Sequence, residues 1–155
     1  MIIQNVAIGA LVDPEGRVLL TRRSERNSVM PNFWEFPGGK ILPKELPEEA
    51  LVRELREELS IETWDSCLAP VTFVSHSYKD FHVILFLFIC RRWDGVIFPK
   101  EGQKFSWVKK NELRDESFDL NKVNDIVYCL KPSSNSYELL DRDWLDKINS
   151  CEAGY

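Results

Sequence analysis

The segment RELREELS, residues 53–60, places three glutamates and two arginines within eight positions. Successive residues of an α-helix are turned by about 100°, so Glu54, Glu57 and Glu58 would share an arc of roughly 100°. Leucines repeated at every fourth position fall beside that arc and form an apolar stripe. The segment therefore predicts an amphipathic helix with one apolar side and one acidic side.

The acidic side has two interpretations. A solvated helix face would tolerate it, because like charges at i,i+3 and i,i+4 cost only about 0.2–0.5 kcal/mol per pair. Carboxylates gathered on one side are also the oxygen ligands that Mg²⁺ and Mn²⁺ prefer. Arg53 and Arg56 are expected to point elsewhere and to leave the acidic side incompletely neutralised. The helix alone does not decide between these interpretations.

The residues around the helix extend the pattern. Fixed spacings connect the following positions: Gly39, Glu45, Arg53, Glu54, Glu57, Glu58 and Ile61. This arrangement over residues 39–61 resembles the signature of the Nudix hydrolases, a loop–helix–loop motif. NFWEFPGGK at 32–40 and KEGQ at 100–103 are similar to the MutT-like branch of that family. One position departs, since Ser60 stands where the family has a glycine, at a helix end that often takes a left-handed conformation.

The resemblance implies an α/β chain with the Nudix fold, a mixed, curved β-sheet between helices in an α/β/α sandwich. Residues 1–131 are expected to form this domain, and residues 132–155 a linker and a short helix of unassigned role. The implied activity is Mg²⁺-dependent hydrolysis of a nucleoside triphosphate, with Mn²⁺ as an alternative ion. Oxidised purine nucleotides such as 8-oxo-dGTP are the first hypothesis, the products being the monophosphate and pyrophosphate.

Other activities within the resemblance stay open. A CTP or modified-dCTP pyrophosphohydrolase is the second hypothesis, and a dinucleoside polyphosphate hydrolase is the third. A Nudix-fold module that binds a nucleotide without cleaving it is the alternative from another class. Such modules usually lose the signature glutamates, which this chain retains.

The resemblance also implies roles for single residues. The metal ligands would be Glu54, Glu57, Glu58, Glu101 and the carbonyl of Gly39. The attacking water would be activated by Glu101, or instead by Glu54 or Glu57. Arg53 would take an orienting part by pairing with Glu45. The ordinary alternatives are an inert loop acid for Glu101 and a weak surface salt bridge for Arg53.

Substrate contacts are implied by position as well. They comprise Arg23 and Lys40 at the phosphates, Glu35 and Phe36 beside the base pocket, and Asn121 or Asn124 at the purine edge. Each has a structural alternative, since exposed cations commonly serve solubility, strand aromatics are mostly core, and asparagine is a frequent helix N-cap.

Composition limits the location and the partners. The 155 residues carry a formal net charge of −5, whereas duplex nucleic-acid binders usually show a basic stripe. The longest apolar run, VILFLFIC, has eight residues, and a membrane span needs about 20. Four separated cysteines without a C-x-x-C pair fit reduced thiols rather than a zinc site. We expect a cytoplasmic monomer or homodimer that binds a nucleoside triphosphate, without membrane or duplex partners.

Hydrophobic patterning predicts the order of the elements. Strands are expected at 4–12, 17–23, 33–36, 70–78, 81–93 and 104–108, and helices at 47–59 and 122–130. The turn signal DPEG at 13–16 suggests that the first two strands form a hairpin. Pro47 suits the first helical position, and the two glutamates after it suit the positive end of the helix dipole.

Overall fold

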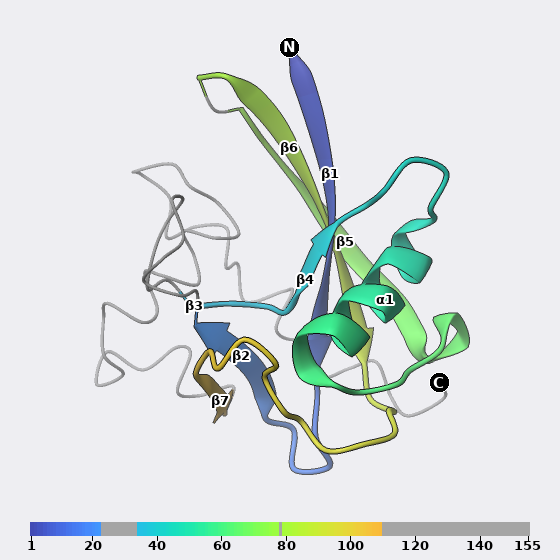
Figure 1. The fold of residues 1–155 in the computed structure, drawn as a ribbon, viewed down its shortest axis with the longest axis vertical. Coiled ribbons are helices and arrows are strands. Elements are labelled where there is room, and N and C mark those ends of the chain that lie inside the picture. Colours follow the sequence, from blue (N-terminus) through green and yellow to red (C-terminus); the bar gives the residue numbers. More distant parts are fainter. Residues whose placement is uncertain (23–33, 78, 110–155) are drawn as a thin grey trace.

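The structure is a computed structural model that describes residues 1–22, 34–77 and 79–109 (Figure 1). These residues form two sheets and one α-helix. A four-stranded sheet has the order β4-β1-β6-β5, and a three-stranded sheet has the order β3-β2-β7. The elements are β1 Ile2–Leu11, β2 Val18–Arg22, β3 Trp34–Glu35, β4 Gly38–Lys40, α1 Pro47–Leu59, the 3-10 turn η1 Asp65–Cys67, β5 Leu68–Ser77, β6 Phe81–Cys90 and β7 Phe105–Val108.

The larger sheet is mixed. β1 runs parallel to β6 over ten residue pairs, and β5 and β4 are antiparallel to β6 and β1, respectively. The parallel pairing brings residues about eighty positions apart into register, as between Ile2 and Phe81. The α/β class and the mixed sheet are thus as predicted, whereas the helix expected at 122–130 and residues 132–155 lie outside the described part of the chain.

The expected hairpin of β1 and β2 is wrong. The turn itself forms, because the N–H of Asp13 donates to the carbonyl of Arg17 and the N–H of Gly16 donates to Asp13, both at 3.0 Å. However, the two strands join different sheets and meet only at the bridge between Val12 and Val18. Both edges of β1 are occupied by β6 and β4, so β2 turns away and pairs with β3 and β7.

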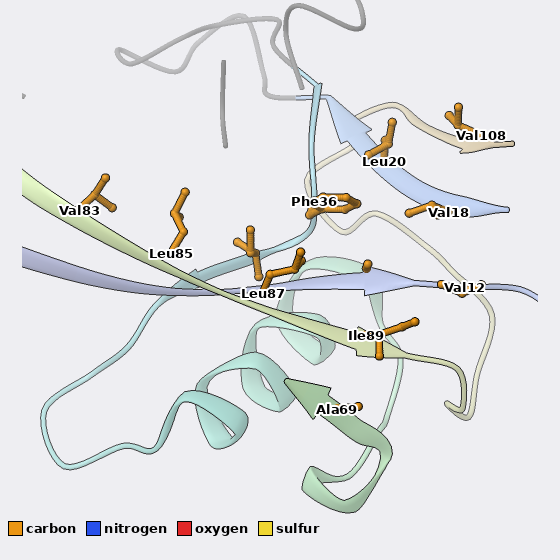
Figure 2. Packing of buried hydrophobic residues seen from close by; sticks show 12 residues of the cluster. Val12, Val18, Leu20, Phe36, Ala69, Val83, Leu85, Leu87, Ile89 and Val108 are labelled. Carbon is orange, nitrogen blue, oxygen red and sulfur yellow. The ribbon is translucent and has the colours of Figure 1, made fainter. Parts of the chain in front are cut away.

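An apolar cluster fills the space between the two sheets. Figure 2 shows β6 side chains on one side of it, with Leu20, Val18 and Phe36 facing them. Phe36 is 3% exposed, and Leu87 on β6 is 4% exposed. Burial of this kind contributes about 1.5–3 kcal/mol for each large side chain. Through Phe36, the cluster fixes the adjoining strand β3, which includes Glu35, relative to the larger sheet.

Helix α1 has the predicted bounds, Pro47–Leu59. Its apolar stripe is fully buried, with Leu51, Leu55 and Leu59 at 0% exposure in a second cluster that includes Leu11 of β1. Gly9 allows close packing, because a Cβ at that position would lie 3.2 Å from a methyl group of Leu51. The burial of one side sets the rotation of the helix and turns its acidic side outward.

The helix ends at Ser60 in the left-handed conformation that its position predicted, with φ 61° and ψ 27°. A non-glycine residue there costs roughly 1–2 kcal/mol. The Ser60 hydroxyl donates to the carbonyl of Phe98 at 3.1 Å, which offsets part of that cost.

Within the described residues, no helix is long and apolar enough to cross a bilayer.

Substitutions at Ser60 separate the cost of the left-handed conformation from the contribution of the hydroxyl hydrogen bond. Ser60→Ala removes the hydroxyl and keeps the left-handed strain, so we expect the free energy of unfolding to fall by about 1 kcal/mol. Ser60→Gly removes both, and we expect it to stay within about 0.5 kcal/mol of the wild type. Urea unfolding of the three proteins measures the difference, and equal losses in both variants would contradict the left-handed conformation.

Candidate active site

Three glutamates of α1 present different environments. The side chain of Glu54 is 16% exposed, whereas that of Glu57 is 59% exposed. Glu58 is partly buried, and its Oε2 accepts a 3.3 Å hydrogen bond from the N–H of Gly38 on β4. The acidic side is therefore graded, from a solvated carboxylate to one that is enclosed between the helix and β4.

Glu58 is the electrostatic centre of the site. Its pKa is raised from 4.5 to about 8, mainly by burial and in addition by the negative charges of Glu35, Glu54 and Glu101. The Gly38 hydrogen bond acts in the opposite direction. The four carboxyl groups come from β3, from α1 and from the loop before β7, so the fold brings together acids that are distant in sequence.

The loop that carries Glu101 is anchored to the end of the helix. The N–H of Phe98 donates to the carbonyl of Leu59 at 2.9 Å, and the N–H of Lys100 donates to the carbonyl of Glu58 at 3.0 Å. These bonds satisfy carbonyls that a helix end would otherwise leave without partners. These contacts were not predicted from the sequence, in which only the position of Ser60 indicated that the chain turns sharply there.

Arg53 binds the predicted partner and others besides. Its Nε and Nη2 donate to the two carboxylate oxygens of Glu45 at 2.7 and 2.9 Å. Its Nη1 donates to Glu54 at 2.7 Å and to Glu57 at 3.4 Å, and Nη2 also reaches the carbonyl of Lys40 at 3.0 Å. The expectation that Arg53 points away from the acidic side is wrong, because its long side chain reaches around the helix.

Arg56 behaves as expected. Its guanidinium donates two hydrogen bonds to Glu62, at 2.6 and 2.8 Å, on the outer surface. Both side chains of this pair are about half exposed, at 51% and 50%. Of the two helix arginines, only Arg53 therefore donates hydrogen bonds to glutamates of the acidic side.

Two glycines keep the backbone close to these carboxylates. At Gly39, an added Cβ would overlap the carboxyl group of Glu54, 2.6 Å from Oε2. At Gly38, which has φ 147°, an added Cβ would overlap the carbonyl oxygen of Ala7 on the neighbouring strand. Gly38 is thus required by space and by conformation, whereas a side chain at Gly39 would displace the carboxyl group of Glu54.

The other predicted site residues lie outside α1 and differ in exposure. Lys40 and Glu101 are exposed, and Glu35 is partly buried on β3, where it pairs with Thr21 of β2. Phe36 lies in the cluster between the sheets (Figure 2). Three predicted substrate residues lie outside the described part of the chain: Arg23, Asn121 and Asn124.

The carboxylates are not arranged as a closed cage. Among residues 1–22, 34–77 and 79–109, no three acidic, histidine or cysteine side chains are grouped so that they could hold a metal ion. Arg53 holds Glu54, and the Gly38 N–H holds Glu58. The carboxyl groups still suit a hard cation, because their donor atoms are oxygens and negative charges lie close together. Gly39, which has no side chain, leaves room for the carboxyl group of Glu54.

Comparison with known proteins places the chain. The family model for the NUDIX domain matches residues 3–129. The chain belongs to the Nudix family. It is 34% identical over 113 residues to the 8-oxo-dGTP diphosphatase of Escherichia coli K12, a match that covers 73% of this chain and 85% of that protein. It is 30% identical over 138 residues to the nucleoside triphosphatase NudI of Salmonella newport, covering 83% and 96%.

Solved structures agree on the fold. A MutT protein from Methanosarcina mazei superposes with a TM-score of 0.67 at 20% identity, covering 96% of this chain and 94% of that one. The solution structure of the Escherichia coli ORF135 protein superposes with a TM-score of 0.63 at 25% identity, covering 88% and 96%. The predicted Nudix fold is confirmed, and the predicted membership among MutT-like Nudix hydrolases is confirmed with it.

The Arg53–Glu45 pair gives a pH-dependent prediction. Hydrogen bonding from Arg53 lowers the pKa of Glu45 from 4.5 to about 2. The pair therefore stabilises the fold above pH 4.5, and this contribution is lost as the pH falls through 2. We expect Arg53→Gln to lower the free energy of unfolding at pH 7 by about 1 kcal/mol, part of the pair's strength being screened by solvent.

Unfolding measured from pH 7 to pH 2 tests this expectation. The difference between wild type and Arg53→Gln should shrink below pH 4.5. Arg56→Gln, which breaks the more exposed pair with Glu62, is the matched control and should lose less stability. A difference that stays constant down to pH 2 would show that the Glu45 carboxylate does not contribute through Arg53.

Proposed function

We propose that this Nudix protein is a Mg²⁺-dependent nucleoside triphosphate pyrophosphohydrolase that acts on oxidised purine nucleotides such as 8-oxo-dGTP. The products would be the nucleoside monophosphate and pyrophosphate. The observation that carries the proposal is the acidic side of α1 against β4. There the Glu58 carboxylate accepts from the Gly38 N–H, the Glu54 carboxyl group lies against Gly39, and the charges of Glu35, Glu54 and Glu101 act on Glu58. The name of the Escherichia coli relative, 8-oxo-dGTP diphosphatase, supports the choice of substrate.

The residues that would hold the cation are oxygen donors from three segments. They are Glu54, Glu57 and Glu58 of α1, Glu101 of the loop before β7, and the carbonyl of Gly39. Bound Mg²⁺ or Mn²⁺ supplies positive charge at the phosphate oxygens and favours the ionised form of a nearby water. The raised pKa of Glu58 fits this use, because a cation at that carboxyl would replace the proton that burial and the neighbouring negative charges favour.

The side chains of the protein would orient the substrate and accept the proton. Arg53, fixed by Glu45, limits the positions that the carboxylate of Glu54 can take. The proton of the attacking water would pass to Glu101, or to Glu54 or Glu57. Lys40 is exposed at the end of β4 and would meet a phosphate group.

The base contacts have unequal support. Glu35 is partly buried near the acidic group and can approach a bound nucleotide. Phe36 is 3% exposed and packs in the core, which leaves it almost no surface for a base contact. Arg23, Asn121 and Asn124 enter the proposal from sequence alone.

A panel of nucleotides separates this proposal from its alternatives. Pyrophosphate release from 8-oxo-dGTP, dGTP, CTP and a dinucleoside polyphosphate would be compared with Mg²⁺ present. Turnover of CTP far above 8-oxo-dGTP would reverse the first two hypotheses. Absence of turnover for every compound would leave a nucleotide-binding module, although the retention of Glu54, Glu57 and Glu58 argues against that outcome.

Replacing Glu57 by Gln tests the acidic side directly. The change removes a ligand's charge at nearly constant shape, and the side chain is 59% exposed, so the fold should be unaffected. We expect kcat to fall by at least about 100-fold, a loss typical of removing a group that stabilises developing charge. Thermal unfolding should stay close to that of the wild type.

Glu48→Gln is the control, since it makes the same chemical change on the same helix. Glu48 lies in the first turn of α1, away from the carboxylates that surround Glu58. It should retain full activity. Normal kcat in Glu57→Gln, or an equal loss in both variants, would contradict the role proposed for Glu57.

A further inference from the structure

A cavity of about 650 Å³ lies where β2 and β7 meet the loop before β7. Its lining includes Arg22, Phe98, Gln103, Lys104 and Phe105. Among the described lining residues, two side chains are cationic and none is acidic, in a chain whose formal net charge is −5. The described part of the lining is therefore cationic, whereas the protein as a whole is negatively charged.

The cavity adjoins the acidic group of the active site. Glu101 lies in the loop between the lining residues Pro99 and Gly102. On the other side, Phe105 pairs with Thr21, which also pairs with Glu35. The charges of Glu101 and Glu35 both act on Glu58, so the cavity opens beside the carboxylates rather than at a remote surface.

Several side chains in the cavity are available to a ligand. Lys104 is exposed and makes no ion pair or side-chain hydrogen bond within the described part of the chain. The Oε1 atom of Gln103 is buried and likewise has no hydrogen-bond partner there, so its amide can meet a ligand or a bridging water. Phe98 and Phe105 are 66% and 39% exposed.

We propose that this cavity receives the phosphate groups beyond the scissile bond, with Lys104 as their charge partner. The inference rests on the proposed function, because it places the scissile bond at the carboxylates of α1. A triphosphate presents its negative charge at the end that becomes pyrophosphate. A cationic cavity beside an acidic, cation-binding group accommodates that end, and it makes Lys104 a determinant of triphosphate over monophosphate binding.

Calorimetric titration with Mg²⁺ tests the proposal with two ligands. One is a dGTP analogue with a methylene bridge between the α- and β-phosphates, and the other is dGMP. We expect Lys104→Gln to raise the Kd of the triphosphate analogue about three- to tenfold and to leave the Kd of dGMP unchanged. The change for the analogue should shrink as salt is added, because the interaction is ionic and partly exposed.

Lys79→Gln is the matched control. Lys79 is an exposed lysine at the turn between β5 and β6, at the far end of the larger sheet from β7 (Figure 1). It should bind both ligands as the wild type does. An equal rise in Kd for both ligands in Lys104→Gln, or no rise for either, would overturn the proposal.

The same design separates the inference from the function on which it rests. If the wild type bound neither nucleotide, the proposed function would fail. Titration with inorganic pyrophosphate and Mg²⁺ then tests the cavity alone. Binding that weakens in Lys104→Gln but not in Lys79→Gln would support an anion site, and pyrophosphate binding that is absent or independent of Lys104 would refute it.

Discussion

Repulsion among the carboxyl groups at Glu58 is the constraint around which the rest of the molecule is arranged. Burial and the charges of Glu35, Glu54 and Glu101 all favour a proton on Glu58. The fold nevertheless holds these groups near one another through short backbone contacts. Gly38 donates to the Glu58 carboxylate, and the Glu58 carbonyl accepts from the loop that carries Glu101. Such an arrangement is unfavourable for four bare anions and favourable once positive charge lies among them.

The apolar side of the same helix keeps this acidic side in place. Leu51, Leu55 and Leu59 are fully buried, so α1 cannot rotate without exposing them. Arg53 then restrains Glu54 from the solvent side, while Glu45 fixes Arg53. Apolar packing therefore holds one side of this short helix, and ion pairs and backbone hydrogen bonds hold the other. Together they fix where the carboxyl groups of the site lie.

Local signals predicted α1 well, whereas long-range pairing was beyond them. Pro47 and the alternation of leucines with glutamates define the helix over 47–59, and the left-handed end at Ser60 followed from its position. The separation of β1 and β2 into different sheets depends on the partners that occupy both edges of β1, which no local turn signal reveals. The reach of Arg53 and the cationic cavity likewise depend on tertiary placement. Arg23, Asn121 and Asn124 remain predictions from sequence.

The most direct test of the central claim is a crystal structure with Mn²⁺ and the methylene-bridged dGTP analogue, in which anomalous scattering locates the metal. We expect a peak about 2.0–2.3 Å from carboxylate oxygens of Glu54 and Glu58 and next to the bridged phosphates. Arg53 should still pair with Glu45 while Glu54 turns toward the ion. A metal bound elsewhere, with these glutamates in bulk solvent and far from any phosphate, would contradict the account.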